Sequence, residues 1–133
     1  MAHPYHHSLS SVKRWGGVTE DYQEIHDFLD SSKSHFGDIR HRALYHHSGG
    51  IFLCEKLFGI VVTNSNGRQV PVRSIAERHV MEDCGRIPSP SDWLSNMNVQ
   101  PWMRRVGTQL SHLEDSNHSN VDTSDEVLSA THI

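Results

Sequence analysis

The sequence predicts a mainly α-helical fold, a compact helical domain with one small β-hairpin. Apolar residues recur at the three- and four-residue spacing of helices, and capping and stop signals separate the periodic segments. Only residues 60–72 contain the β-branched runs that are typical of strands. With 133 residues, of which 35% are apolar, the chain is long enough to bury a core without metals or disulfides.

Composition divides the chain into two parts. Residues 1–106 contain the periodic segments and all three tryptophans, whereas residues 107–133 are rich in Ser, Asn, Asp and Thr and poor in apolar residues. We therefore expect a single helical domain over 1–106 with its hairpin at 60–72, followed by a polar, flexible C-terminal tail over 107–133.

The first two helices are marked by their boundaries. Residues 8–15 are expected to form a short helix that ends at a pair of glycines, and Thr19 then caps a second helix over residues 20–33. Acidic residues in the first turn of this second helix suit the positive end of its dipole. His26 falls on its apolar stripe, and Asp30, one turn later, is close enough to contact His26.

A long third helix is expected over residues 39–58, between a capping Asp38 and a terminating Gly59. Two adjacent glycines, Gly49 and Gly50, interrupt it, and each costs up to about 1 kcal/mol relative to alanine. Either the helix bends at this point, or another backbone or a ligand approaches it closely.

The predicted hairpin is followed by two more helices. Asn66-Gly67 is the sequence of a two-residue type I′ turn, and Pro71 makes the second strand an edge strand. Ser74 and Glu77 have the spacing of a capping box that would open a helix running to residue 84. A last short helix is indicated by Ser89 as its cap, with a proline directly after it.

Charge and composition exclude several classes of protein. The formal net charge is −4, so the chain lacks the basic surface of an indiscriminate nucleic-acid binder. No apolar run approaches the roughly 20 residues that span a bilayer, and "MAHPYHHSLS" has no apolar core of a secretory signal. Cys54 and Cys84 form no CxxC pair. We therefore expect a cytoplasmic protein that is not bound to a membrane.

Histidine is the unusual residue of this chain, with 12 copies. His47 falls on the apolar face of the predicted helix 39–58, and His79 and Asp83 lie four residues apart on a later helix. Imidazole nitrogens and carboxylates suit Zn, Mn, Fe or Ni. We predict that His47, His79 and Asp83 hold one divalent metal ion between two packed helices.

The same residues have a second interpretation, which the sequence leaves open. His47 is then a core histidine bonded to a backbone carbonyl, and His79 with Asp83 is an ordinary pair within one helix. The metal hypothesis is favoured because inward-facing histidines beside carboxylates are costly to bury unless they are paired or coordinated.

Two segments resemble the HD-domain metal phosphohydrolases. "RALYHHSGGIFLCEKLFG" resembles the opening signature, in which a histidine begins an apolar helix, and "ERHVMEDCGRIPSPSDW" resembles the later His-Asp segment. This resemblance implies that His47 is the first metal ligand and Asp83 the aspartate of the pair. Glu82 stands where the second histidine belongs, and His79 lies three residues earlier, so the implied ligand set is altered or lost.

A broader resemblance covers residues 3–102. "HPYHHSLSSVKRWGG", "RHRALYHHSGGIF", "TNSNGRQVPVR" and "DCGRIPSPSDWL" resemble a family of small bacterial and phage-borne proteins of unknown function. That resemblance implies no activity. The hairpin followed by a helix also resembles the ββα-metal nucleases, but the first strand here ends in "VVTNSN", without the histidine of that family.

The sequence thus leads to two functional hypotheses. The first is a metal-dependent hydrolase of a phosphate ester or nucleotide, with Glu82 or His46 carrying the proton and Arg42 or Arg73 holding the phosphate. These arginines have a second interpretation as solvated or paired side chains. The second hypothesis is a non-enzymatic phage or mobile-element protein that docks on a host protein, with structural or pH-sensitive histidines.

Overall fold

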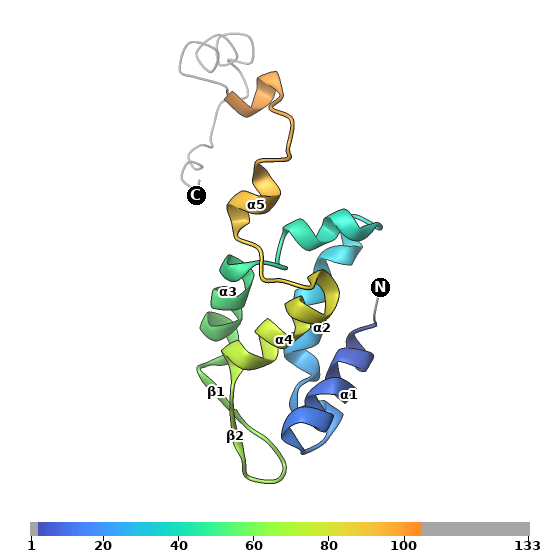
Figure 1. The fold of residues 1–133 in the computed structure, drawn as a ribbon, viewed down its shortest axis with the longest axis vertical. Helices are drawn as coiled ribbons and strands as arrows, with labels where there is room; N and C mark the ends of the chain where they lie inside the picture. The colour runs from blue at the N-terminus through green and yellow to red at the C-terminus, as the bar shows by residue number, and fades with distance from the viewer. Residues whose placement is uncertain (1–2, 105–133) are drawn as a thin grey trace, which may run out of the picture. The chain divides into compact units, whose positions relative to one another are not determined.

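The computed structural model describes residues 3–104 and is mainly helical (Figure 1). The chain divides into two compact units between Met97 and Asn98. This division comes before the change in composition that follows residue 106. The predicted tail over 107–133 lies outside the described residues. The helices and strands of the first unit are α1 (Pro4–Trp15), α2 (Gln23–Asp30), α3 (Ser48–Phe58), β1 (Val61–Thr63), β2 (Gln69–Pro71), α4 (Val72–Cys84) and α5 (Pro90–Leu94).

Helix α4 holds the first unit together, because it contacts α1, α2 and α3 (Figure 1). Three short 3₁₀ helices, Thr19–Asp21, Ser31–Ser34 and Ile39–Ala43, connect the first three helices, and a fourth, Pro101–Arg104, lies in the second unit. The apolar core is small and lies between α2, α3, the second strand and α4. Its buried members are Tyr22, Ile25, Leu29, Ile51, Cys54, Val70, Val72, Ile75, Ala76 and Val80.

The N-terminal helix is longer than the sequence indicated. It starts at Pro4, whose fixed φ suits the first helical position, and His3 caps it by accepting a hydrogen bond from the Tyr5 amide at 3.1 Å. Its end at Gly16 is as predicted. Four more residues of helix carry His7 to the inner face, where its side chain is buried.

The prediction of one continuous helix over 39–58 is wrong. The segment begins as the 3₁₀ helix Ile39–Ala43, leaves helical geometry, and restarts as α3 at Ser48. His47 is the extended N-cap of the new helix, with φ −162° and ψ 175°. Of the alternatives for the two glycines, the close approach of another stretch of backbone is observed at Gly50. A Cβ on Gly50 would lie 1.9 Å from the carbonyl oxygen of Tyr45.

Gly50→Ala is therefore expected to destabilise the protein by roughly 3 kcal/mol or more, because the backbone of Tyr45 cannot move away without deforming the start of α3. Urea unfolding of the purified variant measures this loss. Gly37→Ala is the control, since nothing lies within 4 Å of the added carbon there. Equal stability of the two variants would contradict the packing argument.

The hairpin is confirmed as an antiparallel pair in which Val62 faces Val70, but the predicted type I′ turn between the strands is wrong. Asn66 does not have the positive φ that a type I′ turn requires, and of the loop residues only Gly67 does, at 82°. A longer loop forms instead, because the Oδ1 atom of Asn64 accepts hydrogen bonds from the amides of Asn66 and Arg68.

Helix α4 starts two residues before the predicted Ser74 cap, at Val72, and Pro71 takes the N-cap position without a side-chain bond. The expected capping box of Ser74 and Glu77 is therefore wrong. The capping box of α5 is present, as Ser89 accepts from the Asp92 amide at 3.1 Å and Asp92 accepts from the Ser89 amide at 2.9 Å. Its Pro90 occupies the first position, as predicted.

Candidate metal centre

Five side chains from separate segments meet inside the first unit. We call them the His–Asp cluster: His7 on α1, Asp30 at the end of α2, His46 before α3, and His79 and Asp83 on α4. The exposed fraction of each of these side chains is 3% or less. Burial of two carboxylates at this depth requires a matching positive charge.

The Nε2 atoms of the three histidines converge on the two carboxylates. His79 Nε2 lies 3.3 Å from Asp30 Oδ1 and 3.4 Å from Asp83 Oδ2. His46 Nε2 lies 3.4 Å and 2.9 Å from the same oxygens, and His7 Nε2 lies 3.3 Å from Asp83 Oδ1. Most of these separations are long for hydrogen bonds between nitrogen and oxygen.

His7 is held so that its Nε2 atom is directed into the cluster. Its Nδ1 atom lies 2.7 Å from Oε1 of Glu82, while the buried Nε2 atom has no hydrogen-bond partner. Glu82 is fixed in turn by Ser10 and by Arg78. A carboxylate behind one ring nitrogen, with the other nitrogen free, is the usual environment of a metal-binding histidine.

His79 also has its Nδ1 atom held by a second residue, while its Nε2 atom lies 3.3 Å from Asp30 Oδ1. Its Nδ1 atom lies 2.9 Å from Nδ1 of His26, and Nε2 of His26 lies 2.8 Å from the hydroxyl of Ser11. All three residues are buried. The expected contact between His26 and Asp30 is not the one observed, because Asp30 contacts His46, His79 and Lys33 instead.

His46 differs from the other two cluster histidines. Its Nδ1 atom is buried and has no hydrogen-bond partner, whereas its Nε2 atom faces the carboxylates of Asp30 and Asp83 and therefore carries a proton. Its Nε2 atom makes the shortest contact in the cluster, 2.9 Å to Asp83. The backbone carbonyl of His46 accepts a hydrogen bond from Trp93 Nε1 at 2.9 Å, which anchors this segment.

Charges in the cluster stabilise one another. Burial alone would raise the pKa values of Asp30 and Asp83, but the neighbouring imidazoles reverse this and hold both well below the usual range. Burial opposes protonation of His7 and His46, yet contacts with the carboxylates raise the pKa of each. The cluster therefore provides a negative site that attracts cations, whether protons or a metal ion.

These residues could hold a metal ion. One donor atom from each of His7, Asp30, His79 and Asp83 lies within 4.8 Å of the other three. Bonds of about 2.1 Å around a tetrahedral zinc ion give edges of about 3.4 Å between ligand atoms. The separations of 3.3 Å from His79 Nε2 to Asp30 Oδ1 and of 3.4 Å to Asp83 Oδ2 match these edges, and two carboxylates neutralise a divalent charge.

Of the three predicted ligands, His79 and Asp83 lie in the cluster and His47 does not. Both ring nitrogens of His47 contact the backbone: Nδ1 accepts from the Gly50 amide at 3.1 Å, and Nε2 lies 3.0 Å from the carbonyl oxygen of Leu44. His47 is therefore the cap of α3, and the neighbouring His46 faces the cluster instead.

His47→Ala is expected to destabilise the protein by roughly 1 kcal/mol through loss of the cap, and to leave Zn²⁺ affinity unchanged. Thermal unfolding and calorimetric titration with Zn²⁺ measure the two quantities. His35→Ala, at an exposed position, serves as the control for stability. A large loss of Zn²⁺ affinity would return His47 to the ligand set.

The remaining predicted site residues lie at different positions relative to the His–Asp cluster. Glu82 contacts His7 from outside the cluster and so orients a candidate ligand. Arg42 reaches the cluster, with Nη1 donating to the Asp83 carbonyl at 3.1 Å and Nη2 lying 3.7 Å from Asp83 Oδ1. Its buried Nε atom has no partner. Arg42 also lines an open pocket of about 330 Å³ with Cys84, Arg86, Pro88, Asp92, Trp93 and Asn96.

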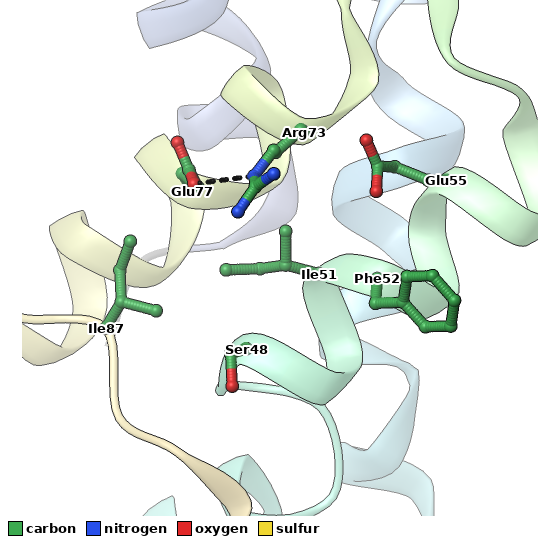
Figure 2. Close-up of a pocket in the computed structure, with 7 residues that line it drawn as sticks. All are labelled: Ser48, Ile51, Phe52, Glu55, Arg73, Glu77 and Ile87. Carbon is green, nitrogen blue, oxygen red and sulfur yellow. Dashed lines mark hydrogen bonds and ion pairs between the residues drawn. The ribbon is translucent and has the colours of Figure 1, made fainter.

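Arg73 does not belong to this site. It is largely exposed and pairs with Glu77 at 3.1 Å on the same helix. Both line a smaller pocket of about 150 Å³ over the apolar side chain of Ile51, and Glu55 lies on its opposite wall (Figure 2). None of the His–Asp cluster lines that pocket. Arg73 is therefore not placed to hold a phosphate beside the candidate metal ion.

Sequence reasoning missed His7 and Asp30 as candidate ligands. His7 lay before the expected start of the first helix, and its partners Glu82 and Asp83 are more than 70 residues away in the chain. Asp30 was noted only as a neighbour of His26. One signal in the sequence could have indicated them. His26 lies on the apolar stripe of its helix, and that stripe had to pack against another element.

The fold and the cluster define a class: a small, mainly helical protein with a buried group of histidines and aspartates that could hold a metal ion. Residues 2–103 match the family model described as a domain of unknown function, DUF6915. Because this match covers most of the chain, the protein belongs to that family. No curated protein and no solved structure matches. Within residues 3–104, no helix is long and apolar enough to cross a membrane.

Proposed function

We propose that this protein binds one divalent metal ion in the His–Asp cluster and hydrolyses a phosphate ester or nucleotide. We propose further that the protein is HD-like, comes from a bacterium or phage, and acts in the cytoplasm. Free Cys54 and Cys84 suit that compartment. The ligands in this proposal are His7, Asp30, His79 and Asp83, with Zn, Mn, Fe or Ni as the ion.

One observation carries the proposal: His7 and His79 each have Nδ1 in a hydrogen bond while Nε2 is directed at buried carboxylates. Hydrogen bonding alone leaves His7 Nε2 without a partner. A divalent ion satisfies that atom and balances both carboxylates, which accounts for the burial of so many polar groups.

A bound ion would supply Lewis acidity and lower the pKa of a water molecule toward neutrality. His46 is the group that would take and return a proton, because only one side of its ring is engaged and Asp83 stabilises its charged form. Glu82 holds His7 in place. These roles divide the two predicted catalytic residues into a proton carrier and a positioning residue.

Arg42 would hold the phosphate. Its guanidinium connects the cluster, through Asp83, to the pocket that also contains Arg86 and Trp93. The guanidinium charge would attract a phosphate group, and the indole offers an apolar surface for a base or ester group. This supports a small phosphorylated substrate bound at that pocket.

Two measurements on the purified, untagged full chain test the proposal. The first is metal content by mass spectrometry, which we expect to give one ion for each chain. The second is hydrolysis of p-nitrophenyl phosphate, of bis-p-nitrophenyl phosphate and of a nucleotide panel with Zn²⁺, Mn²⁺ or Ni²⁺ added. A chain that takes up no metal and hydrolyses none of these would refute the proposal.

Arg42→Ala is expected to raise KM at least tenfold while kcat falls less, because the phosphate loses its main contact but the cluster retains its ligands. Steady-state kinetics with the best substrate of the panel measure both constants. Arg40→Ala is the matched control, since Arg40 is exposed and contacts the nearby Asp38 and Phe36 rather than the cluster. An unchanged KM for Arg42→Ala would remove this role.

A second candidate function is favoured by the depth of the cluster and by apolar side chains on the surface. A buried metal ion or proton network would then be structural, and the protein would dock on a host protein without catalysis. Exposed apolar side chains follow α3 into the first strand: Phe52, Leu53, Leu57, Ile60 and Val61. A stoichiometric metal without hydrolysis of any phosphate ester favours this candidate.

A further inference from the structure

Behind the candidate ligand His79 lies a buried chain of hydrogen bonds that ends on another helix. His79 Nδ1 lies 2.9 Å from His26 Nδ1, and His26 Nε2 lies 2.8 Å from the hydroxyl of Ser11. The chain of hydrogen bonds thus runs from α4 through α2 to α1, and each residue in it is 1% exposed or less.

Two arrangements of protons satisfy this chain when His26 is neutral. In one, His26 carries its proton on Nδ1, donates to His79, and accepts from Ser11 through Nε2. In the other, His79 carries a proton on Nδ1 and donates it to His26, and His26 donates from Nε2 to Ser11. The two arrangements exclude each other, because a single proton occupies the contact between the two rings.

A metal ion on His79 Nε2 permits only the second arrangement. The ring nitrogen opposite the ion must carry the proton, so His79 Nδ1 becomes a donor and needs an acceptor inside the protein. His26 Nδ1 is at the right distance to be that acceptor. It can accept only while its own proton is on Nε2, where the hydroxyl of Ser11 receives it.

We propose that His26 and Ser11 are positioning residues that fix the tautomer of His79 and thereby set the metal affinity of the cluster. This inference rests on the proposed metal site and adds a second layer to it. His26 plays for His79 the part that Glu82 plays for His7, but with a neutral acceptor.

Calorimetric titration with Zn²⁺, in competition with a chelator of known affinity, tests the inference. His26→Phe keeps a ring of similar size but offers no acceptor, and we expect its Zn²⁺ affinity to fall roughly 10- to 100-fold. His26→Asn keeps an acceptor at the position of Nδ1, and its affinity should stay within a few-fold of the wild type. A merely structural role would weaken both variants alike.

A second pair of variants tests the far end of the chain and is mild enough to preserve folding. Ser11→Ala should weaken Zn²⁺ binding several-fold, because the proton on His26 Nε2 loses its acceptor. Ser8→Ala is the matched control: this serine is on the same helix, is fully buried, and its hydroxyl has no partner. Unchanged affinity of Ser11→Ala would overturn the role of Ser11.

Nitrogen-15 spectra of the Zn²⁺-loaded wild type give an independent readout. We expect the proton of His26 on Nε2; a proton on Nδ1 would overturn the inference. Failure of the inference and failure of the metal site are distinguishable. If the wild type binds no Zn²⁺, both are overturned. If it binds Zn²⁺ but His26→Phe binds equally tightly, only the tautomer control is overturned.

Discussion

Asp83→Asn is expected to weaken Zn²⁺ binding at least 100-fold and to lower the free energy of unfolding by roughly 3 to 5 kcal/mol. Asp83 contacts His7, His46, His79 and Arg42, and its side chain is only 3% exposed. The substitution keeps the shape of the side chain and removes its charge, which leaves Asp30 as the one remaining carboxylate of the cluster. Urea unfolding and calorimetric titration measure the two effects.

Asp38→Asn is the matched control for this experiment. Asp38 caps a 3₁₀ helix and pairs with Arg40, but its side chain is 53% exposed, so water screens the charge. We expect no measurable loss of stability and no change in Zn²⁺ affinity. Equal Zn²⁺ binding by Asp83→Asn and the wild type would remove Asp83 from the ligand set.

The second large effect is a loss of stability in acid that depends on His26. Burial, with the charges of His79 and His7, lowers the pKa of His26 to about 2, whereas an unfolded histidine titrates near 6.5. Between these values the unfolded chain binds a proton that the folded chain does not. Stability contributed by His26 is therefore present above pH 6.5 and falls by about 1.4 kcal/mol for each pH unit below it.

Urea unfolding of the wild type and of His26→Asn, with a chelator present, measures this slope between pH 6 and 4.5. The wild type should lose stability more steeply than the variant by about 1.4 kcal/mol for each pH unit. His7 and His46, whose pKa values are raised, act in the opposite direction in both proteins and so largely cancel in the difference. Parallel slopes would show that His26 titrates normally.

The mainly helical fold with one hairpin was predictable because its signals are local. Gly16, Gly59 and Gly85 end helices where the sequence indicated, and Ser89 caps α5. Helix starts were less accurate, since they depend on contacts that are distant in the chain. The Val72 amide, for example, donates to the carbonyl of Ile60, which lets α4 begin directly from the second strand.

The candidate site was predictable only in part, for a geometric reason. Helical periodicity assigned the inward position to His47 because it assumed a continuous helix over 39–58. The chain is extended at His47, so neighbouring side chains point to opposite sides and His46 faces the cluster instead. Nothing local to residue 7 indicates that α1 lies against α4, so His7 required the tertiary structure.

The hydrogen bond from Trp93 to the carbonyl of His46 has a practical consequence. An indole is fluorescent, and this one is fixed to the backbone of a cluster residue while its ring also borders the neighbouring pocket. Its emission should therefore change when an ion or an anion enters, and subtraction of a Trp93→Phe spectrum removes the signal of Trp15 and Trp102. Trp93 fluorescence can therefore report the binding of a metal ion or an anion to this protein.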